Sequence, residues 1–149
     1  MGYPNELLDV GWKLVSTEPV TEAALRRAVS SAYYALFHLL IEETCRNWPH
    51  ATHRGRLSRQ FDHGRMRAAS DALAKMSAPG TDTFVVANTF VHLQQERHQA
   101  DYDLTTTFSL IEATVDLIAA ELAFQSWEHI KDDAAAQDYL FSLLFKDRA

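Results

Sequence analysis

The side chains of this chain best suited to catalysis or ligand binding are clustered in the segment 96–103. An arginine, a histidine, a tyrosine and two aspartates fall within seven residues there. If a helix runs through this segment, Arg97 lies beside Asp101 and His98 lies beside Tyr102, because side chains four residues apart share a helix face. Arginine binds phosphate through paired hydrogen bonds, and histidine transfers protons near neutral pH. The segment is therefore able to bind and cleave a phosphodiester, or it simply ends a helix.

Two features of the same segment limit its catalytic use. Adjacent helical residues point about 100° apart, so Arg97 and His98 converge on one phosphate only if the helix frays or two copies meet at a dimer axis. A carboxylate at Asp101 would also neutralise the guanidinium and repel a phosphate. The alternative is structural: Arg97 pairs with Asp101 and His98 is solvated. In that case Tyr102 occupies a core or interface position.

A second candidate region is rich in arginine. The segment from residue 46 to residue 67 contains six arginines and only one acidic residue, Asp62. A planar, always-charged guanidinium suits phosphate better than a lysine does, so this region predicts a nucleic-acid or nucleotide surface. The alternative is a solvated helix face paired with the acidic helices elsewhere. The net charge of −6 argues against a protein that coats DNA generally.

Length and composition indicate one soluble domain. A chain of 149 residues, 47% of them apolar, is long enough to bury a substantial core. Its single cysteine, Cys45, rules out an internal disulfide and fits a reducing cytoplasm. Neither a signal peptide nor a membrane-spanning run is evident, so we expect a cytoplasmic protein without a membrane contact. No zinc motif, glycine-rich phosphate loop or serine-nucleophile elbow occurs, so we expect no metal and no cofactor.

Apolar residues recur at helical spacing almost throughout, and no strand signal is strong. We expect helices over about residues 5–15, 20–46, 57–76, 83–102, 107–127 and 134–145. The second has an apolar stripe wide enough to pack two neighbours. The last is apolar on most sides, so either its own core or another chain must cover it. The sequence predicts an all-α, up-and-down helical bundle of about five to six helices, as one domain over residues 1–149.

Two of these helices carry motifs that occur together in a known family. The second reads R-A-V-S-S-A-Y-Y-A-L-F-H over residues 27–38, and the fourth ends in R-H-Q-A-D-Y over residues 97–102. In this order and at this separation, the pair resembles the HEPN family, particularly its small prokaryotic single-domain branch. The intervening residues His53, Gly55 and Phe61 look like that branch too. The resemblance covers about residues 5–127 and leaves out the apolar C-terminal segment.

The resemblance implies a helical bundle that dimerises through the helices carrying the motifs. Many HEPN members look like metal-independent endoribonucleases, either toxins paired with a nucleotidyltransferase-like or other antitoxin, or parts of antiviral systems. Their signature is an arginine followed by four to six residues and a histidine. Here Tyr102 occupies the position five residues after Arg97, and the histidine is the adjacent His98. Arg56 and His63 have the signature spacing, but they lie on another helix, and we interpret that match as coincidence.

The leading hypothesis is a homodimeric HEPN-like endoribonuclease that acts on RNA, with a possible antitoxin or nucleotidyltransferase-like partner. Its candidate catalytic residues are Arg97 as the phosphate cation, with His98 and Tyr102 as proton-transfer groups. Its candidate substrate-binding residues are Asp101, Arg27, His38, Arg56 and Arg59. His38 lies on the apolar stripe of its helix, where a buried, hydrogen-bonded histidine is the alternative.

Two other hypotheses stay open. The first is a HEPN nucleotide-binding or partner-docking module whose active site has decayed, as the missing downstream histidine suggests. The second is a helical interaction protein unrelated to nucleic acid.

Overall fold

The computed structural model describes residues 2–146, and this part of the chain is helical and contains no strand. It forms seven α-helices and one 3₁₀ turn. They are α1 (Tyr3–Val15), α2 (Glu22–Arg46), η1 (Ala51–His53), α3 (Arg54–Ser58), α4 (His63–Met76), α5 (Asp82–Tyr102), α6 (Leu110–Ile130) and α7 (Ala134–Leu144).

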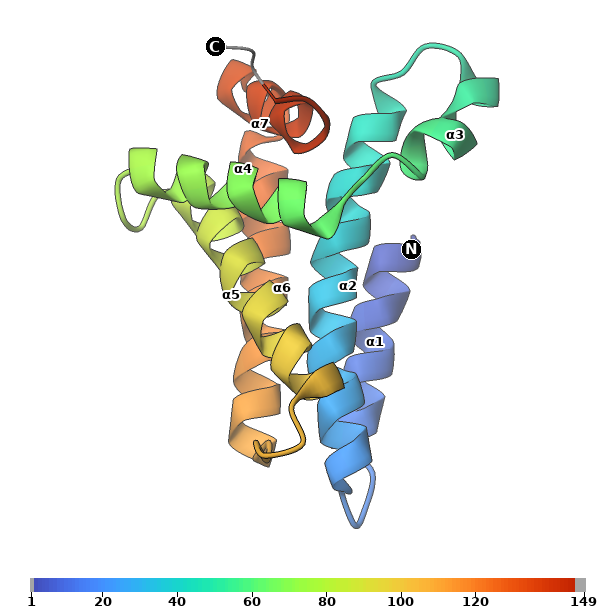
Figure 1. Ribbon diagram of the computed structural model, residues 1–149, viewed down its shortest axis with the longest axis vertical. Coiled ribbons are helices and arrows are strands. Elements are labelled where there is room, and N and C mark those ends of the chain that lie inside the picture. The colour runs from blue at the N-terminus through green and yellow to red at the C-terminus, as the bar shows by residue number, and fades with distance from the viewer. Residues whose placement is uncertain (1, 147–149) are drawn as a thin grey trace.

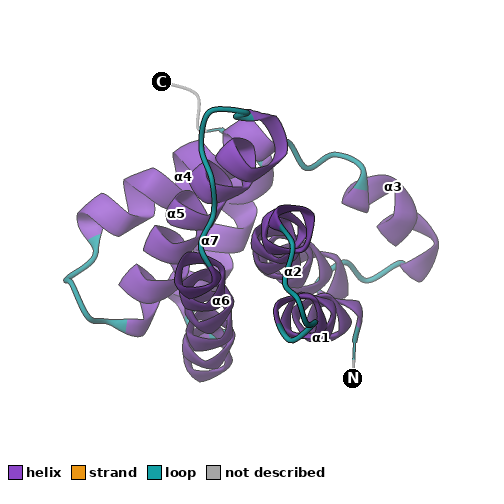
Figure 2. Ribbon diagram, turned by 90° about the horizontal axis from the view of Figure 1, so that it is seen from below, coloured by secondary structure: helices purple, strands orange, loops and turns teal. Residues whose placement is uncertain are grey.

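Four helices, α1, α2, α5 and α6, form the body of the molecule, and each runs opposite to the one before it (Figure 1). This alternation agrees with the up-and-down bundle expected from the sequence. Helices α4 and α7 lie at one end, where α4 crosses in front of this body and packs against α7. The short α3 projects to one side in both views (Figures 1 and 2).

Helix α2 lies at the centre, as its wide apolar stripe predicts. It packs against α1, α5 and α6, and its fully buried side chains cover a wide arc of the helix that includes Tyr33, Ala35 and Leu36. Thr21 begins the helix, because its hydroxyl accepts a hydrogen bond from the amide of Ala24 at 3.1 Å. The side chains of α2 can therefore contribute to sites on more than one side of the bundle.

The predicted helix over residues 57–76 is in fact two helices, α3 and α4, so the expected count of five to six was too low. The break lies at Asp62, whose backbone is extended and whose carboxylate accepts a hydrogen bond from the amide of Gly64 at 2.9 Å. An aspartate in this position begins a new helix. His63 consequently stands in the first turn of α4.

Helix α1 reaches α6 through Gly11. A Cβ atom on Gly11 would lie 2.5 Å from Cδ2 of Leu117, a buried side chain of α6, and 3.6 Å from the carbonyl oxygen of Ala28 on α2. No larger residue fits without a shift in the packing. The glycine therefore permits the close approach of three helices.

The C-terminal helix packs on its own chain along one face. Leu140 and Leu143 of α7 are buried, and the Tyr139 hydroxyl lies 2.7 Å from the Ser70 hydroxyl of α4. Phe141 and Phe145 are more than half exposed. The sequence analysis offered two ways to bury this helix, against its own core or against another chain. The core of its own chain covers one face of the helix only. Residues 147–149 lie outside the described part of the chain.

Between residues 2 and 146 no helix has the length and apolar character needed to cross a bilayer.

Candidate functional site

Arg97 points into the bundle. Its residue surface is only 8% exposed, and its guanidinium carbon lies 5.2 Å from the ring centroid of Tyr33 and 5.7 Å from that of Tyr34, both on α2. These distances are those of cation–π contacts, which strengthen when the cation is desolvated. The Nε atom is buried and has no hydrogen-bond partner among residues 2–146. A buried guanidinium nitrogen without an acceptor is energetically costly, so a hydrogen-bond acceptor placed beside Arg97 Nε would be stabilised.

Asp101 is the counter-charge of Arg97, as the four-residue spacing predicts. One of its oxygens, Oδ2, lies 3.7 Å from Arg97 Nη1, and the other, Oδ1, accepts a hydrogen bond from the Ser30 hydroxyl at 2.5 Å. The first distance is too long for a good hydrogen bond, so the pair is held mainly by charge. An incoming anion would compete with Asp101 for the guanidinium.

His63 joins this group from α4. Its Nδ1 atom is hydrogen-bonded to the Tyr33 hydroxyl at 2.6 Å, and its ring stacks on that of Phe37 with 4.5 Å between centroids. The Gln94 side chain of α5 donates a hydrogen bond to the His63 carbonyl oxygen at 3.1 Å. Three helices thus meet in one polar group, the Arg97 cluster. It consists of Ser30, Tyr33, Tyr34, His63, Arg97 and Asp101.

The surroundings of His63 and Tyr33 shift the pKa of each side chain so that its neutral form is favoured. Burial, and then the charge of Arg97, lower the pKa of His63 below its usual 6.5. Burial raises the pKa of Tyr33 well above its usual value, although Arg97 acts against this change. His63 is therefore a neutral base near neutral pH, hydrogen-bonded to a phenol that keeps its proton.

His98 and Tyr102 lie on a different face of α5 from Arg97. Tyr102 is 65% exposed and His98 is also exposed, and their ring centroids are 5.1 Å apart. Their mutual contact was expected from the spacing. Arg97, however, does not converge with them, because the helix continues unbroken through Tyr102 and neighbouring side chains diverge by about 100°. Within one chain, the three candidate catalytic residues do not form one site.

Two candidate substrate-binding residues line a groove between α1 and α2. Arg27 and His38 share this groove of about 550 Å³ with Ser30 and Tyr34. Burial, and then the proximity of His63, lower the pKa of His38. Since Ser30 and Tyr34 also belong to the Arg97 cluster, the groove reaches the outer edge of that cluster.

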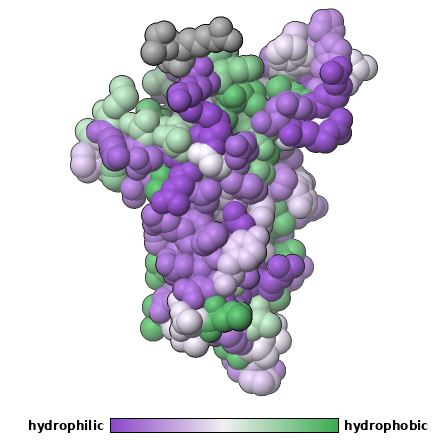
Figure 3. All heavy atoms as spheres, in the orientation of Figure 1, coloured by the Kyte–Doolittle hydropathy of each residue, from purple (hydrophilic) through white to green (hydrophobic). Residues whose placement is uncertain are grey.

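Arg56 and Arg59 lie apart from the Arg97 cluster. Both are exposed on or just after α3, in the hydrophilic lobe at the upper right of Figure 3. Arg56 lines a separate hollow of about 280 Å³ with Trp48 and His53. In the folded chain the signature-spaced His63 is grouped with Arg97, and Arg56 is not part of that cluster.

Sequence reasoning missed the roles of His63, Tyr33 and Ser30 beside Arg97. These residues come from α2 and α4, and their spacing along the chain carries no signal of their meeting. The motif in α2 did contain Tyr33, Tyr34 and Ser30, and this was the available clue.

Comparison with protein-family models, with curated proteins and with solved structures finds no match to this chain.

The Arg97–Asp101 pair should show strong energetic coupling. Replacing either partner alone (Arg97→Met or Asp101→Asn) leaves a buried polar group unmatched, whereas the double variant removes both charges. We expect the double variant to be less destabilised than the sum of the single variants by about 1–3 kcal/mol, measured by urea unfolding. The control is the exposed pair Asp71 and Lys75, with 2.8 Å between its charged atoms. Its coupling should be only about 0.3–0.5 kcal/mol. Equal coupling in the two pairs would contradict the prediction.

His63 should make the fold less stable in acid. Its pKa is lowered in the folded state, so the unfolded chain takes up the proton first, and the contribution of His63 is complete above its usual pKa of 6.5 and is lost as the pH falls below it. Between about pH 7.5 and pH 5.5, the wild type should lose more unfolding free energy than His63→Asn does. The difference between the two proteins isolates His63 from the other titrating groups. Parallel stability curves would contradict this assignment.

Proposed function

We propose that this protein is a HEPN-like, metal-independent endoribonuclease whose active site is the Arg97 cluster. The observation that supports this most is the buried Arg97 guanidinium, which contacts Tyr33 and whose Nε has no hydrogen-bond partner within the described chain. The Tyr33 hydroxyl is in turn hydrogen-bonded to His63, whose pKa is lowered. The proposal keeps Arg97 as the phosphate cation. It assigns proton transfer to His63 in place of His98 and Tyr102.

The chemistry needs three groups. A base removes the proton of the ribose 2′-hydroxyl, and the resulting oxygen attacks phosphorus. A cation stabilises the charge on the phosphorus oxygens, and a proton donor, either the protonated base or water, protonates the 5′-oxygen as its bond to phosphorus breaks. The products are a cyclic phosphate and a 5′-hydroxyl. Neutral His63 is suited to the first proton transfer when its Nδ1–H is donated to the Tyr33 oxygen, because Nε2 then has a free lone pair. Arg97 is suited to the charge that develops on the phosphorus oxygens.

Access to Arg97 runs along the groove between α1 and α2. Both Ser30 and Tyr34 line this groove; Tyr34 contacts Arg97, and the Ser30 hydroxyl donates a hydrogen bond to Asp101, the counter-charge of Arg97. A phosphate that binds there must take the place of Asp101 beside the guanidinium. Because the 3.7 Å distance between Arg97 Nη1 and Asp101 Oδ2 is too long for a hydrogen bond, this exchange breaks none and costs less than the loss of a bidentate pair would. Arg27 and His38 on the same groove are then placed to contact the substrate.

The family resemblance also motivates a homodimer and an antitoxin or nucleotidyltransferase-like partner. The apolar surface available for a dimer lies on α6, however, and not on α2 or α5, which carry the motifs. There Ile111, Val115, Ile118 and Leu122 form an apolar stripe, since they recur at helical spacing and are each more than 40% exposed. A two-fold axis can place such a stripe against its own copy. His98 and Tyr102, which face outward, could reach an active site only from a second copy.

The second candidate function is a HEPN nucleotide-binding or partner-docking module without catalysis. Asp101 favours it, because this carboxylate occupies the side of Arg97 that a phosphate needs. It is also favoured by the absence of a histidine at the signature spacing after Arg97, where Tyr102, Asp103 and Leu104 stand. In this case the Arg97 cluster holds α2, α4 and α5 together, and ligand contact is confined to the groove.

RNA cleavage in the presence of EDTA tests the proposal. Purified wild type should cleave single-stranded RNA, and Arg97→Gln and His63→Asn should each lower the rate by about 10²-fold or more. The matched controls are Lys75→Gln, a cation remote from the cluster, and His98→Asn. Both should retain the wild-type rate.

Other outcomes separate the hypotheses. Loss of cleavage in His98→Asn with normal cleavage in His63→Asn would restore the sequence-based assignment. RNA binding by the wild type without cleavage would favour the module. Circular dichroism of each variant distinguishes loss of the site from loss of the fold.

The α6 stripe should carry the dimer. The wild type should show twice the 16.9 kDa mass of one chain in light scattering, and Ile118→Glu should reduce it to one chain, because a charge buried in an apolar interface is costly. Leu104→Glu, at a 93% exposed position in the loop after α5, is the control and should stay dimeric. A monomeric wild type would contradict the prediction.

A further inference from the structure

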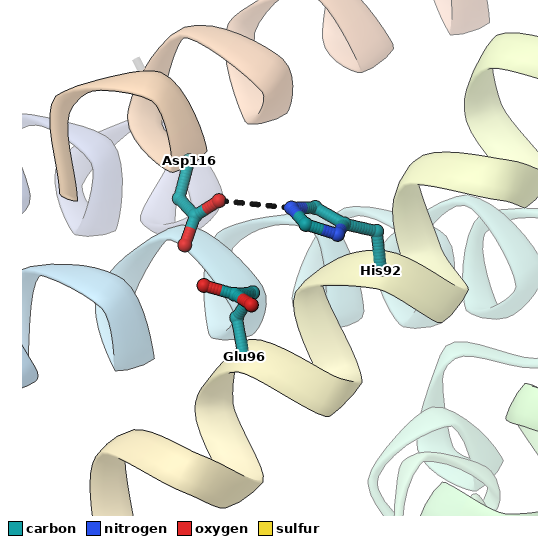
Figure 4. A group of neighbouring side chains, drawn as sticks. All are labelled: His92, Glu96 and Asp116. Carbon is teal, nitrogen blue, oxygen red and sulfur yellow. Dashed lines mark hydrogen bonds and ion pairs between the residues drawn. The ribbon is translucent and has the colours of Figure 1, made fainter. Parts of the chain in front are cut away.

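A second polar group lies where α5 faces α6. His92 and Glu96 are four residues apart on α5, and Asp116 projects toward them from α6 (Figure 4). One nitrogen or oxygen atom from each residue lies within 4.8 Å of those of the other two. The Arg97 cluster has different members, from α2, α4 and α5, so the two groups are separate.

Asp116 is the residue that most needs an explanation. It is 2% exposed, and its Oδ1 atom lies 3.0 Å from His92 Nε2. Its Oδ2 atom is buried and, within the described chain, has no hydrogen-bond partner. A buried carboxylate oxygen without a donor is costly to maintain. In Figure 4 this oxygen is on the side of Glu96, so two carboxylates face each other beside an imidazole.

Two carboxylates in such a place require positive charge between them. Burial, and then the negative charge of Asp116, raise the pKa of Glu96 to about 7. The hydrogen bond to Asp116 raises the pKa of His92. A proton can supply the positive charge, and so can a metal ion, which is held by the same lone pairs.

We propose that His92, Glu96 and Asp116 bind a divalent transition-metal ion through one imidazole nitrogen and two carboxylate oxygens. A mixed set of nitrogen and oxygen ligands suits Zn²⁺ or Mn²⁺ and is less suited to Mg²⁺, which prefers oxygen alone. Three protein ligands leave further coordination positions for water.

The geometry is close to what such an ion needs. Bond lengths of about 2.0–2.2 Å place neighbouring ligands of a tetrahedral zinc site about 3.3 Å apart. His92 Nε2 and Asp116 Oδ1 are 3.0 Å apart, and the flexible Glu96 side chain can move inward. The His92 side chain is 47% exposed, so an ion can enter from solvent, while Asp116 supplies a buried anchor.

The sequence analysis expected no metal, because the ligands match no short motif. His92 and Glu96 are four residues apart, but the third ligand follows twenty residues later on another helix. A bound ion would fix α5 against α6. It takes no part in the chemistry proposed for Arg97, so it is tested independently of RNA cleavage.

Calorimetric titration of the metal-free protein with ZnCl₂, MnCl₂ and MgCl₂ tests the site, with Co²⁺ absorption as the report on ligand geometry. We expect one equivalent of Zn²⁺ or Mn²⁺ to bind and to raise the melting temperature. His92→Ala and Glu96→Gln should each weaken binding by about tenfold or more. The matched control is His129→Ala, which removes an exposed histidine paired to Asp82 at 3.2 Å without a third ligand. It should bind as the wild type does.

The absence of any heat or melting shift with Zn²⁺ and Mn²⁺ would overturn the proposal. Equal loss of binding in His129→Ala and His92→Ala would also overturn it, because the ion would then bind surface histidines in general. Melting curves in EDTA show whether His92→Ala and Glu96→Gln fold. If His92→Ala unfolds, Glu96→Gln with the Co²⁺ spectrum decides the question alone, because it keeps the size of the side chain.

Discussion

The burial of one guanidinium organises this structure. Arg97 lies inside the bundle, and a desolvated charge of this kind must be compensated from every side. Helix α2 supplies two aromatic rings and α5 supplies Asp101. The first turn of α4 supplies His63, bonded to one of those rings. The N-terminal end of α4 is therefore joined to α2 by a polar contact.

The helices themselves were largely predictable, because apolar spacing determines which face of each helix is buried. The central position of α2 followed from its wide stripe. The break between α3 and α4 was not predicted, since Asp62 reads equally well as the interior of a polar helix face and as a cap. Which reading holds depends on how the chain packs after it.

In the candidate site, contacts within one helix could be predicted from the sequence, whereas contacts between helices could not. The contacts of Arg97 with Asp101 and of His98 with Tyr102 are local to one helix, so spacing alone predicted them. The contact of Tyr33 with His63 joins residues thirty positions apart on different helices. No pattern in one sequence encodes such a meeting. The same holds for Asp116, whose partners His92 and Glu96 lie on another helix.

Gly11 has a consequence for the groove between α1 and α2. The missing side chain lets α1 settle against Leu117 and Ala28, and α1 also forms the apolar wall of that groove. The width of the opening thus depends on the side-chain atoms that Gly11 lacks on a neighbouring face of the same helix. Replacing Gly11 by alanine would push α1 away from Leu117. This would change the shape of the groove without altering any residue that lines it.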